Sequence, residues 1–418
     1  MRGRFSFVAR IFALALLVAG ATAQDSLNVR QVGLLSGSWD YAYSVAVVDT
    51  LAYVAAGNSG LHIVNVTNPA GPFEVGFYDT PWYATGVAVS GNYAYVADGH
   101  SGLRVVNITN PAEPTEAGFY DTPGSASDVA VSGNYAYVAD VDGGLRVANI
   151  SNPSGPFEAG FCSTPRNAIG VAVAGNHAFV ADDFSGFRVV DITNPSSPVE
   201  TGFCSMLGQA VALAIAGDYA YVAAGYGGLR VVDITNPFSP FVAGFCDTPQ
   251  SAYGVAVAGN YAYVATYDCG LRAVNIANPT TPVEVGFYDT PGLAQGVAVS
   301  GNYAYVADGL YFGIYDCSAA TGISGRPIAQ TLTWTLNANF PNPFNPTTQI
   351  SFDVPRAERV TVNVYNITGQ FVQTLVNERL TPGTHILRFD GSNLSSGTYF
   401  YRLASPDFSA TRKMVLVK

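Results

Sequence analysis

Charged residues are scarce in this chain, and lysine is nearly absent. Only 12% of the 418 residues are charged, and both lysines lie within the last six positions. The formal net charge of −11 is unevenly spread, because residues 24–330 carry −17 while residues 331–418 carry +3. An acidic surface of this kind repels nucleic acid and anionic lipid. The sequence therefore excludes nucleic acid as a partner and favours cationic or neutral polar ligands.

Histidine is also rare, and no catalytic pattern is found. The four histidines, at positions 62, 100, 177 and 385, do not pair at the spacing of metal ligands. The chain has no nucleophile elbow, phosphate loop or HExxH sequence. We therefore expect a protein that is not an enzyme and has no catalytic residue.

Five cysteines, an odd number, argue against a framework of disulfides. Cys162, Cys204 and Cys246 are 42 residues apart and replace a recurrent tyrosine, so they are expected to be half-buried apolar side chains. A bond between Cys246 and Cys269 remains possible on sequence grounds.

Only one segment has the composition of a membrane element, a short apolar run at the N-terminus. Arginines at positions 2, 4 and 10 precede the apolar run 11–18, and Ala21-Thr22-Ala23 follows. This order is typical of a secretory signal peptide, predicted here as residues 1–23; the alternative is an uncleaved anchor. No transmembrane segment is expected once the signal is removed.

A repeat of 42 residues dominates the rest of the chain. Asn-Pro recurs at 68, 110, 152, 194, 236 and 278, and Tyr-Ala-Tyr-Val or a close relative occurs seven times. Each unit reads as four short alternating segments rich in Val, Tyr and Phe, separated by turn residues. Four strands in about 40–45 residues is the size of a propeller blade. We predict an all-β, seven-bladed β-propeller of four-stranded antiparallel blades over residues 24–317.

The two ends of the repeat region favour a closed ring over a β-solenoid, the rival fold. Residues 27–35 read as a fourth strand without a unit of their own, whereas the last unit, 297–317, has three strands. The N-terminal strand is therefore expected to complete the last blade and remove the open sheet edges. The first strand of each unit is expected to line the central channel with Ala, Val, Ser and Gly, which offer no acid or base.

The repeat ends before the C-terminal part. Residues 318–332 are small and polar, as expected for a linker. Residues 333–418 contain their own strand patterns and turn residues, which predict a small Ig-like antiparallel β-sandwich.

Both parts resemble known families. The recurrent G-L-R-V-V-[ND]-I-[TS]-N-P, as at 102–111 and 228–237, with V-A-V-x-G-N-Y-A-Y-V-A, resembles the LVIVD-repeat propellers. That resemblance implies a surface or extracellular module of undefined ligand. NFPNPFNPTTQISFDV (339–354), VYNITGQFVQTL (364–375), GTHILRFDGSNLSSGTYFYRL (383–403) and TRKMVLVK (411–418) are similar to the type A sorting domain of the type IX secretion system.

The second resemblance implies a route and a set of partners. They are passage through the periplasm, contact with the outer-membrane sorting machinery, and attachment to the cell surface, often to lipopolysaccharide. Lys413 and Lys418 match the family's basic C-terminal end and are the candidate sorting contacts. The alternative is an ordinary Ig-like accessory domain with solvated lysines.

Aspartates recur in loops that a propeller places on one face. Carboxylates are hard oxygen ligands that suit Ca²⁺, the one cofactor considered. In the alternative interpretation, which the repetition favours, each aspartate caps a turn, and the strand-three arginines pair with aspartates inside the blades. The candidate ligands are Asp98, Asp140, Asp142, Asp182, Asp183, Asp268 and Asp308.

Binding residues are expected where the repeat varies. Exposed aromatic side chains beside carboxylates can stack on a glycan or hold a peptide; the alternative is loop packing. The candidates are Trp39, Tyr41, Trp82, Tyr83, Arg166 and Tyr253. The sequence thus predicts a binding or scaffold module with a glycan or protein ligand, and the alternative is a propeller hydrolase or lyase acting on polysaccharide or peptide.

Overall fold

The computed structural model describes residues 26–37, 39–321, 334–336, 339, 342–356, 358–380 and 383–418. The predicted signal peptide lies outside these residues. Every regular element in the described part of the chain is a β-strand, and no helix there could cross a membrane. The five cysteines are free, so the conceivable bond between Cys246 and Cys269 is absent.

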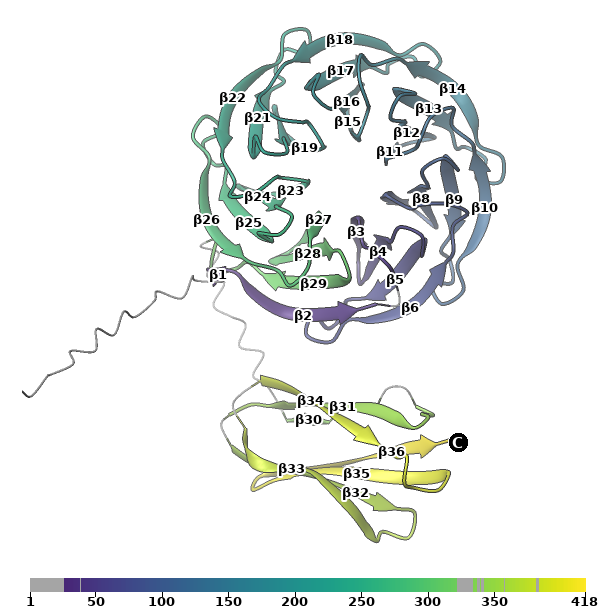
Figure 1. The fold of residues 1–418 in the computed structure, drawn as a ribbon, viewed down its shortest axis with the longest axis vertical. Coiled ribbons are helices and arrows are strands. Elements are labelled where there is room, and N and C mark those ends of the chain that lie inside the picture. The colour runs from purple at the N-terminus through teal and green to yellow at the C-terminus, as the bar shows by residue number, and fades with distance from the viewer. Residues whose placement is uncertain are drawn as a thin grey trace, which may run out of the picture.

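Seven four-stranded antiparallel sheets are arranged radially about one axis, which confirms the predicted propeller (Figure 1). Blades 1 to 6 are β3–β6, β7–β10, β11–β14, β15–β18, β19–β22 and β23–β26, and blade 7 is β27–β29 with β2. The innermost strands are β3 (Ser44–Val48), β7 (Gly86–Ser90), β11 (Asp128–Ser132), β15 (Gly170–Ala174), β19 (Ala212–Ala216), β23 (Gly254–Ala258) and β27 (Ala294–Ser300).

The second strands carry the aromatic repeat, and one tyrosine or phenylalanine of each is buried between blades. These strands are β4 (Leu51–Ala55), β8 (Tyr93–Ala97), β12 (Tyr135–Ala139), β16 (His177–Ala181), β20 (Tyr219–Ala223), β24 (Tyr261–Ala265) and β28 (Tyr303–Asp308). Tyr95, for example, packs with Val129 and Val138 of the next blade. The aromatic repeat therefore fills the gap between blades, as expected from its alternation.

The third strands are almost wholly buried, and the fourth form the outer rim. The third strands are β5 (Leu61–Asn65), β9 (Leu103–Asn107), β13 (Leu145–Asn149), β17 (Phe187–Asp191), β21 (Leu229–Asp233), β25 (Leu271–Asn275) and β29 (Tyr311–Asp316). The fourth strands are β6 (Phe73–Tyr78), β10 (Thr115–Tyr120), β14 (Phe157–Cys162), β18 (Val199–Cys204), β22 (Phe241–Cys246), β26 (Val283–Tyr288) and β2 (Arg30–Ser36).

The N-terminal segment closes the ring, as the sequence predicts. Strand β2 pairs with β29, with Gly33 opposite Ile314, and Arg30 forms an ion pair with Asp316 at 3.0 Å. A further strand, β1 (Ser26–Leu27), adds to the outer edge of β26 in blade 6. The N-terminal segment therefore joins the last two blades, and blade 6 gains a fifth strand.

Each Asn-Pro turn packs on the rim of the preceding blade. The fourth strand of that blade has a β-bulge beside a glycine, and a Cβ on Gly76 would lie 2.4 Å from the carbonyl oxygen of Pro111. Blade 7 has no such turn, because its third and fourth strands come from opposite ends of the repeat region. Leu27 and Ala320 cover the equivalent Gly286 instead.

The first four residues of the expected linker 318–332 pack on the propeller. Residues 318–321 form a turn on the propeller, where Ala320 and Thr321 are buried and Tyr261 donates a hydrogen bond to the Thr321 carbonyl. The four residues close the gap that the missing turn would leave on blade 6. The rest of the expected linker, up to 332, lies outside the described residues.

The C-terminal part is a small two-sheet β domain. One sheet contains β30 (Thr335–Leu336), β31 (Thr347–Val354) and β34 (Gly383–Asp390); the other contains β32 (Glu358–Asn366), β33 (Phe371–Leu380), β35 (Gly397–Ser405) and β36 (Phe408–Leu416). Its core includes Phe344, Phe352, Tyr401 and Met414, all of them nearly or fully buried. Alternating apolar positions on both sheets thus form one core, as expected for a sandwich.

Candidate ligand-binding face

Two kinds of loop meet on one face of the propeller. The loop between the second and third strands of each blade forms a backbone bridge with the loop that leads into the next blade, for example Gly57 with Ala84 and Gly99 with Ala126. The bridging residue has a positive φ in every blade, and it is glycine in four of them. Val141, Asp183 and Tyr267 adopt the same left-handed conformation, which is rare for residues other than glycine.

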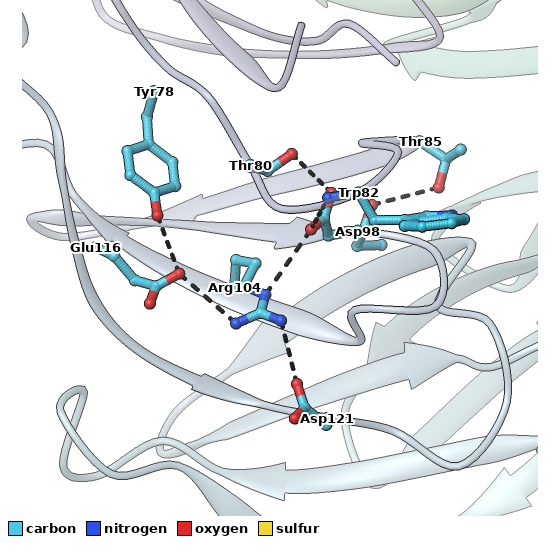
Figure 2. Close-up of polar contacts among 9 residues, drawn as sticks. Tyr78, Thr80, Trp82, Thr85, Asp98, Arg104, Glu116 and Asp121 are labelled. Carbon is cyan, nitrogen blue, oxygen red and sulfur yellow. Dashed lines mark hydrogen bonds and ion pairs between the residues drawn. The ribbon is translucent and has the colours of Figure 1, made fainter. Parts of the chain in front are cut away.

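The recurrent aspartates point inward and hold neighbouring blades together. Asp98 is fully buried; its carboxylate accepts hydrogen bonds from the Thr80 hydroxyl at 2.6 Å and the Trp82 backbone N–H at 3.0 Å, both in the loop from blade 1 (Figure 2). Asp140 and Asp308 are bonded in the same way by Thr122 and Thr290. Asp182 is also buried and accepts a bond from the Arg166 backbone N–H. Each aspartate thereby satisfies polar groups between blades.

The seven candidate calcium ligands do not come together. Asp142 and Asp268 are exposed at loop tips, whereas Asp183 is buried and contacts Asn167. Among the residues that the structure describes, no three His, Cys, Asp or Glu side chains are placed to hold a metal ion. The carboxylates of the buried aspartates instead accept hydrogen bonds from the loop that leads in from the preceding blade. These aspartates are Asp98, Asp140, Asp182 and Asp308.

Arginines on the third strands of blades 2 to 4 pair with these aspartates, as the structural alternative predicts, whereas those of blades 5 and 6 pair with the aspartates that follow the fourth strand. The Arg104 guanidinium lies 3.8 Å from Asp98, 3.7 Å from Glu116 and 3.1 Å from Asp121 (Figure 2). It also covers the ring of Phe119 at 4.5 Å, a cation–π contact that recurs in four further blades. Burial raises the pKa of Asp98, while its hydrogen bonds and Arg104 oppose that shift.

Blade 7 keeps the aspartate but lacks the arginine. Gly313 stands at the arginine position, and the Tyr315 ring occupies the space beside it. Burial raises the pKa of Asp308 to about 6, although Thr290 and the Gly292 N–H lower it. Without a guanidinium nearby, a buried carboxylate retains its proton to higher pH.

Trp82 is the most distinctive side chain on this face. Its backbone N–H is fixed by Asp98, yet its side chain is 54% exposed. The indole lies over Gly99, where a Cβ would be 2.7 Å from Trp82 Cδ1, and it meets His100 edge-on at 5.8 Å. Trp82 lines two hollows, of about 510 and 280 Å³. Trp82 therefore presents an exposed aromatic ring in a fixed position.

Tyrosines form a cluster beside Trp82, near the inner strands. The Tyr43 and Tyr83 hydroxyls are 2.7 Å apart, the Tyr41 and Tyr43 ring centroids are 4.7 Å apart, and Gln295 donates to the Tyr41 hydroxyl. Burial, with the neighbouring Tyr83, raises the pKa of Tyr43. Tyr41, Trp82 and Tyr83 were predicted from the sequence, whereas Tyr43 was missed, although it is equivalent to the predicted Tyr253 of blade 6; the other blades have Thr85, Ser127, Ile169, Val211 and Gln295 there.

Two of the other candidates stand apart, and one expectation is wrong. Tyr253 is half-buried against Tyr267, with ring centroids 5.3 Å apart, and Arg166 is exposed on the loop from blade 3. Trp39 is not exposed but 4% accessible, and it packs edge-on against His62 at 5.1 Å. It fills the space left by the replacement of arginine with the shorter histidine in blade 1.

The expectation that the innermost strands offer no acid is also wrong. Asp128 begins β11 at a position where other blades have glycine, alanine or serine. Its two carboxylate oxygens accept bonds from the backbone N–H groups of Val129 at 2.9 Å and Val171 at 3.0 Å. Burial raises its pKa to about 6. Alignment of the seven units would have revealed it, since no other unit has a charge there.

The candidate sorting lysines lie at the end of the C-terminal domain. Lys413 is exposed on β36, and the Lys418 ammonium donates to the Ser392 carbonyl at 2.6 Å. Their contact with the sorting machinery stays a prediction.

Two family models match this chain. The LVIVD repeat matches seven segments, residues 40–80, 82–122, 123–164, 165–205, 207–248, 249–290 and 291–323. The chain belongs to the LVIVD-repeat family. Residues 338–418 match the secretion system C-terminal sorting domain, which contacts the sorting machinery, so this LVIVD-repeat protein is secreted and located at the cell surface.

Solved structures support the fold alone. The WD40 β-propeller domain of Doa1 is 11% identical, with a TM-score of 0.55 over 69% of this chain and 97% of that one. The computationally designed Ika8 protein is 10% identical, with a TM-score of 0.52 over 69% and 99% of the two chains. None of the curated proteins matches the LVIVD-repeat chain.

Proposed function

We propose that the propeller is a binding module displayed on the bacterial cell surface, and that Trp82 is the centre of its ligand-contacting face. The observation that carries this proposal is an indole that is more than half exposed, is fixed by Asp98, Gly99 and His100, and lines two hollows. Burying such a ring against a ligand releases water from a large apolar area with little loss of side-chain entropy.

The distribution of aromatic residues supports the same site. Tyr41, Tyr43, Trp82 and Tyr83 gather in the loops that lead into blades 1 and 2, whereas the equivalent loops of blades 3 to 5 carry Ser125, Asn167 and Gln209, and that of blade 6 carries a single tyrosine, Tyr253. The blades are otherwise nearly identical, so ring stability alone does not demand the difference. A concentration of aromatic side chains in variable loops on a rigid scaffold is typical of a recognition surface.

The enzymatic alternative, a hydrolase or lyase, has less support. In the described part of the chain, the carboxyl groups with a pKa of about 6 are Asp128 and Asp308, and both are engaged by backbone N–H groups. Neither lines the hollows beside Trp82. A glycoside hydrolase needs two carboxyl groups facing one bond, one of them with a raised pKa, and Asp128 and Asp308 do not form such a pair beside Trp82.

Export supplies the context for binding. We infer that the chain crosses the periplasm after signal removal, that the C-terminal domain engages the outer-membrane machinery through Lys413 and Lys418, and that the propeller is then attached to the surface, with lipopolysaccharide as the candidate anchor. The basic balance of residues 331–418, +3, supports contact with acidic groups.

A glycan and peptide array tests the binding proposal. Mature protein should bind a subset of ligands, and Trp82→Ala should lose them while retaining the wild-type melting temperature. Tyr226→Ala is the matched control, because Tyr226 is 68% exposed in a blade 5 loop of the same face but outside the aromatic cluster. Binding that survives in Trp82→Ala, or is lost equally in Tyr226→Ala, contradicts the proposal.

A further inference from the structure

Blade 1 departs from the other blades at the arginine position. Strand β5 carries His62 where strands β9, β13, β17, β21 and β25 carry arginine. In blades 2, 5 and 6 this arginine pairs with an aspartate that follows the fourth strand, at 3.1 Å for Asp121, 3.4 Å for Asp247 and 2.9 Å for Asp289. The equivalent residue in blade 1 is Asp79.

His62 does not replace the arginine as a partner of Asp79. One ring nitrogen lies 3.0 Å from Glu74 Oε2 and the other 3.1 Å from the Ser59 carbonyl oxygen, so both are already engaged. Asp79 is exposed, and among the described residues no Lys, Arg or His side chain lies within ion-pair distance of it. Blade 1 thus keeps the carboxylate of the repeat but not its internal cation.

The carboxylate that lacks a cation lies beside Trp82. Asn58, Asp79, Thr80, Pro81 and Trp82 line the hollow of about 510 Å³. Asn58 donates to Asp40 Oδ2 at 2.6 Å, which places a second carboxylate at its edge. No lysine or arginine lines the hollow, and residues 24–330 carry a net charge of −17. A cation is the group that this electrostatic environment attracts.

We propose that this hollow binds the arginine or lysine side chain of a basic peptide segment, with its charge against Asp79 and its apolar stem or guanidinium plane on Trp82. The same chemistry holds five arginines inside the protein, where the guanidinium of Arg104 lies 4.5 Å from the Phe119 ring and 3.1 Å from Asp121. Tryptophan is the strongest cation–π partner among the side chains. The inference rests on the proposed function and names its ligand chemistry.

The test compares two blocked tripeptides of nearly the same shape, of which one carries a charged guanidinium and the other a neutral ureido group. Acetyl-Gly-Arg-Gly-amide and its citrulline counterpart are titrated into mature protein, residues 24–418, and binding is followed by ligand-observed NMR. We expect saturable binding of the arginine peptide, weakened by added salt because the exposed charges are screened, and none of the citrulline peptide. Equal binding of the two peptides, or binding of neither, overturns the inference.

Variants locate the site. Asp79→Asn and Trp82→Ala should each weaken binding of the arginine peptide up to about fivefold, the range for one exposed ion pair or cation–π contact. Asp121→Asn is the matched control, because that carboxylate is exposed but already paired with Arg104. Unchanged binding in Asp79→Asn, or an equal loss in Asp121→Asn, refutes the assignment.

A third arm separates this inference from the proposed function. Neutral oligosaccharides are titrated into wild-type protein and Trp82→Ala under the same conditions. Binding of a saccharide that depends on Trp82, with none of the arginine peptide, overturns the cationic ligand but supports the binding face. Absence of any binding that depends on Trp82 overturns both.

Discussion

Replacement of Arg188 by leucine should destabilise the propeller strongly, because it leaves a buried carboxylate without its counter-ion. Arg188 is 8% exposed; its Nε donates to Asp182 Oδ2 at 3.2 Å, and Nη1 lies 3.4 Å from Glu200. Asp182 is fully buried. Removal of one partner of a buried ion pair costs about 3–5 kcal/mol. We expect a loss of that size at pH 7, measured as the change in urea midpoint multiplied by the m-value.

The chain contains its own control for the packing part of this loss. Arg230 of blade 5 is equally buried and lies 4.7 Å from the Phe245 ring, but Ala224 replaces the buried aspartate and Val242 replaces the glutamate. Its ion pair is with the exposed Asp247, at 3.4 Å. Arg230→Leu loses the cation–π contact and a surface pair, about 1–2 kcal/mol. The excess loss of unfolding free energy in Arg188→Leu therefore measures the cost of leaving the buried Asp182 carboxylate without a counter-ion.

The excess loss of stability in Arg188→Leu should be smaller at acidic pH. Burial already raises the pKa of Asp182, and Arg188 opposes that shift, so its removal raises the pKa further. A protonated carboxyl needs no counter-ion, so the loss in Arg188→Leu should be about 1 kcal/mol smaller at pH 5 than at pH 7. Equal losses in Arg188→Leu and Arg230→Leu at both pH values would refute the reasoning.

Three further predictions concern Asp308, Gly76 and the C-terminal domain. Burial raises the pKa of Asp308 to about 6, above the unfolded value of about 3.9, so between these pH values the folded protein binds a proton that the unfolded chain lacks. The contribution of Asp308 to the free energy of unfolding therefore falls as pH rises from about 4 to 6. Urea unfolding should show that this free energy declines less over that range in Asp308→Asn than in wild type, and an identical decline contradicts the assignment. Gly76→Ala places a Cβ 2.4 Å from the Pro111 carbonyl and should cost about 1–3 kcal/mol by calorimetry, whereas Gly71→Ala, with its nearest contact at 3.4 Å, serves as the control and should be nearly neutral. Deletion of 331–418 should leave the propeller in the periplasm with its melting temperature unchanged, as measured by fractionation and surface proteolysis, and normal surface display of the truncated chain would count against the sorting role.

The fold could be predicted because its determinants are local and repeated. A period of 42 residues, alternating apolar positions and turn residues recur along the repeat region, so blades 1 to 6 each specify their own four strands. The incomplete last unit and the unmatched segment 27–35 predicted the pairing of β2 with β29. A closed ring follows because an open edge strand leaves backbone N–H and C=O groups unpaired.

The candidate site was predicted in part. Variation among the loops identified Trp82, Tyr83 and Tyr41, because residues that the ring does not require differ from blade to blade. Asp128 was overlooked although its signal is present in the sequence, where one unit alone has a charge at the start of its first strand.

Only the tertiary structure decided which aromatic side chains are exposed and which carboxylates have an ion-pair partner. Trp39 and Trp82 occupy similar loops, yet Trp39 is buried over His62 whereas Trp82 lies over Gly99 and faces solvent. In the same way, His62 leaves Asp79 without the cation that Asp121 receives from Arg104. The sequence by itself determined the blades and their order, because those depend on contacts within one unit. Which side chains remain free for a ligand depends on what the neighbouring blade places against them, and only the closed ring brings those groups together.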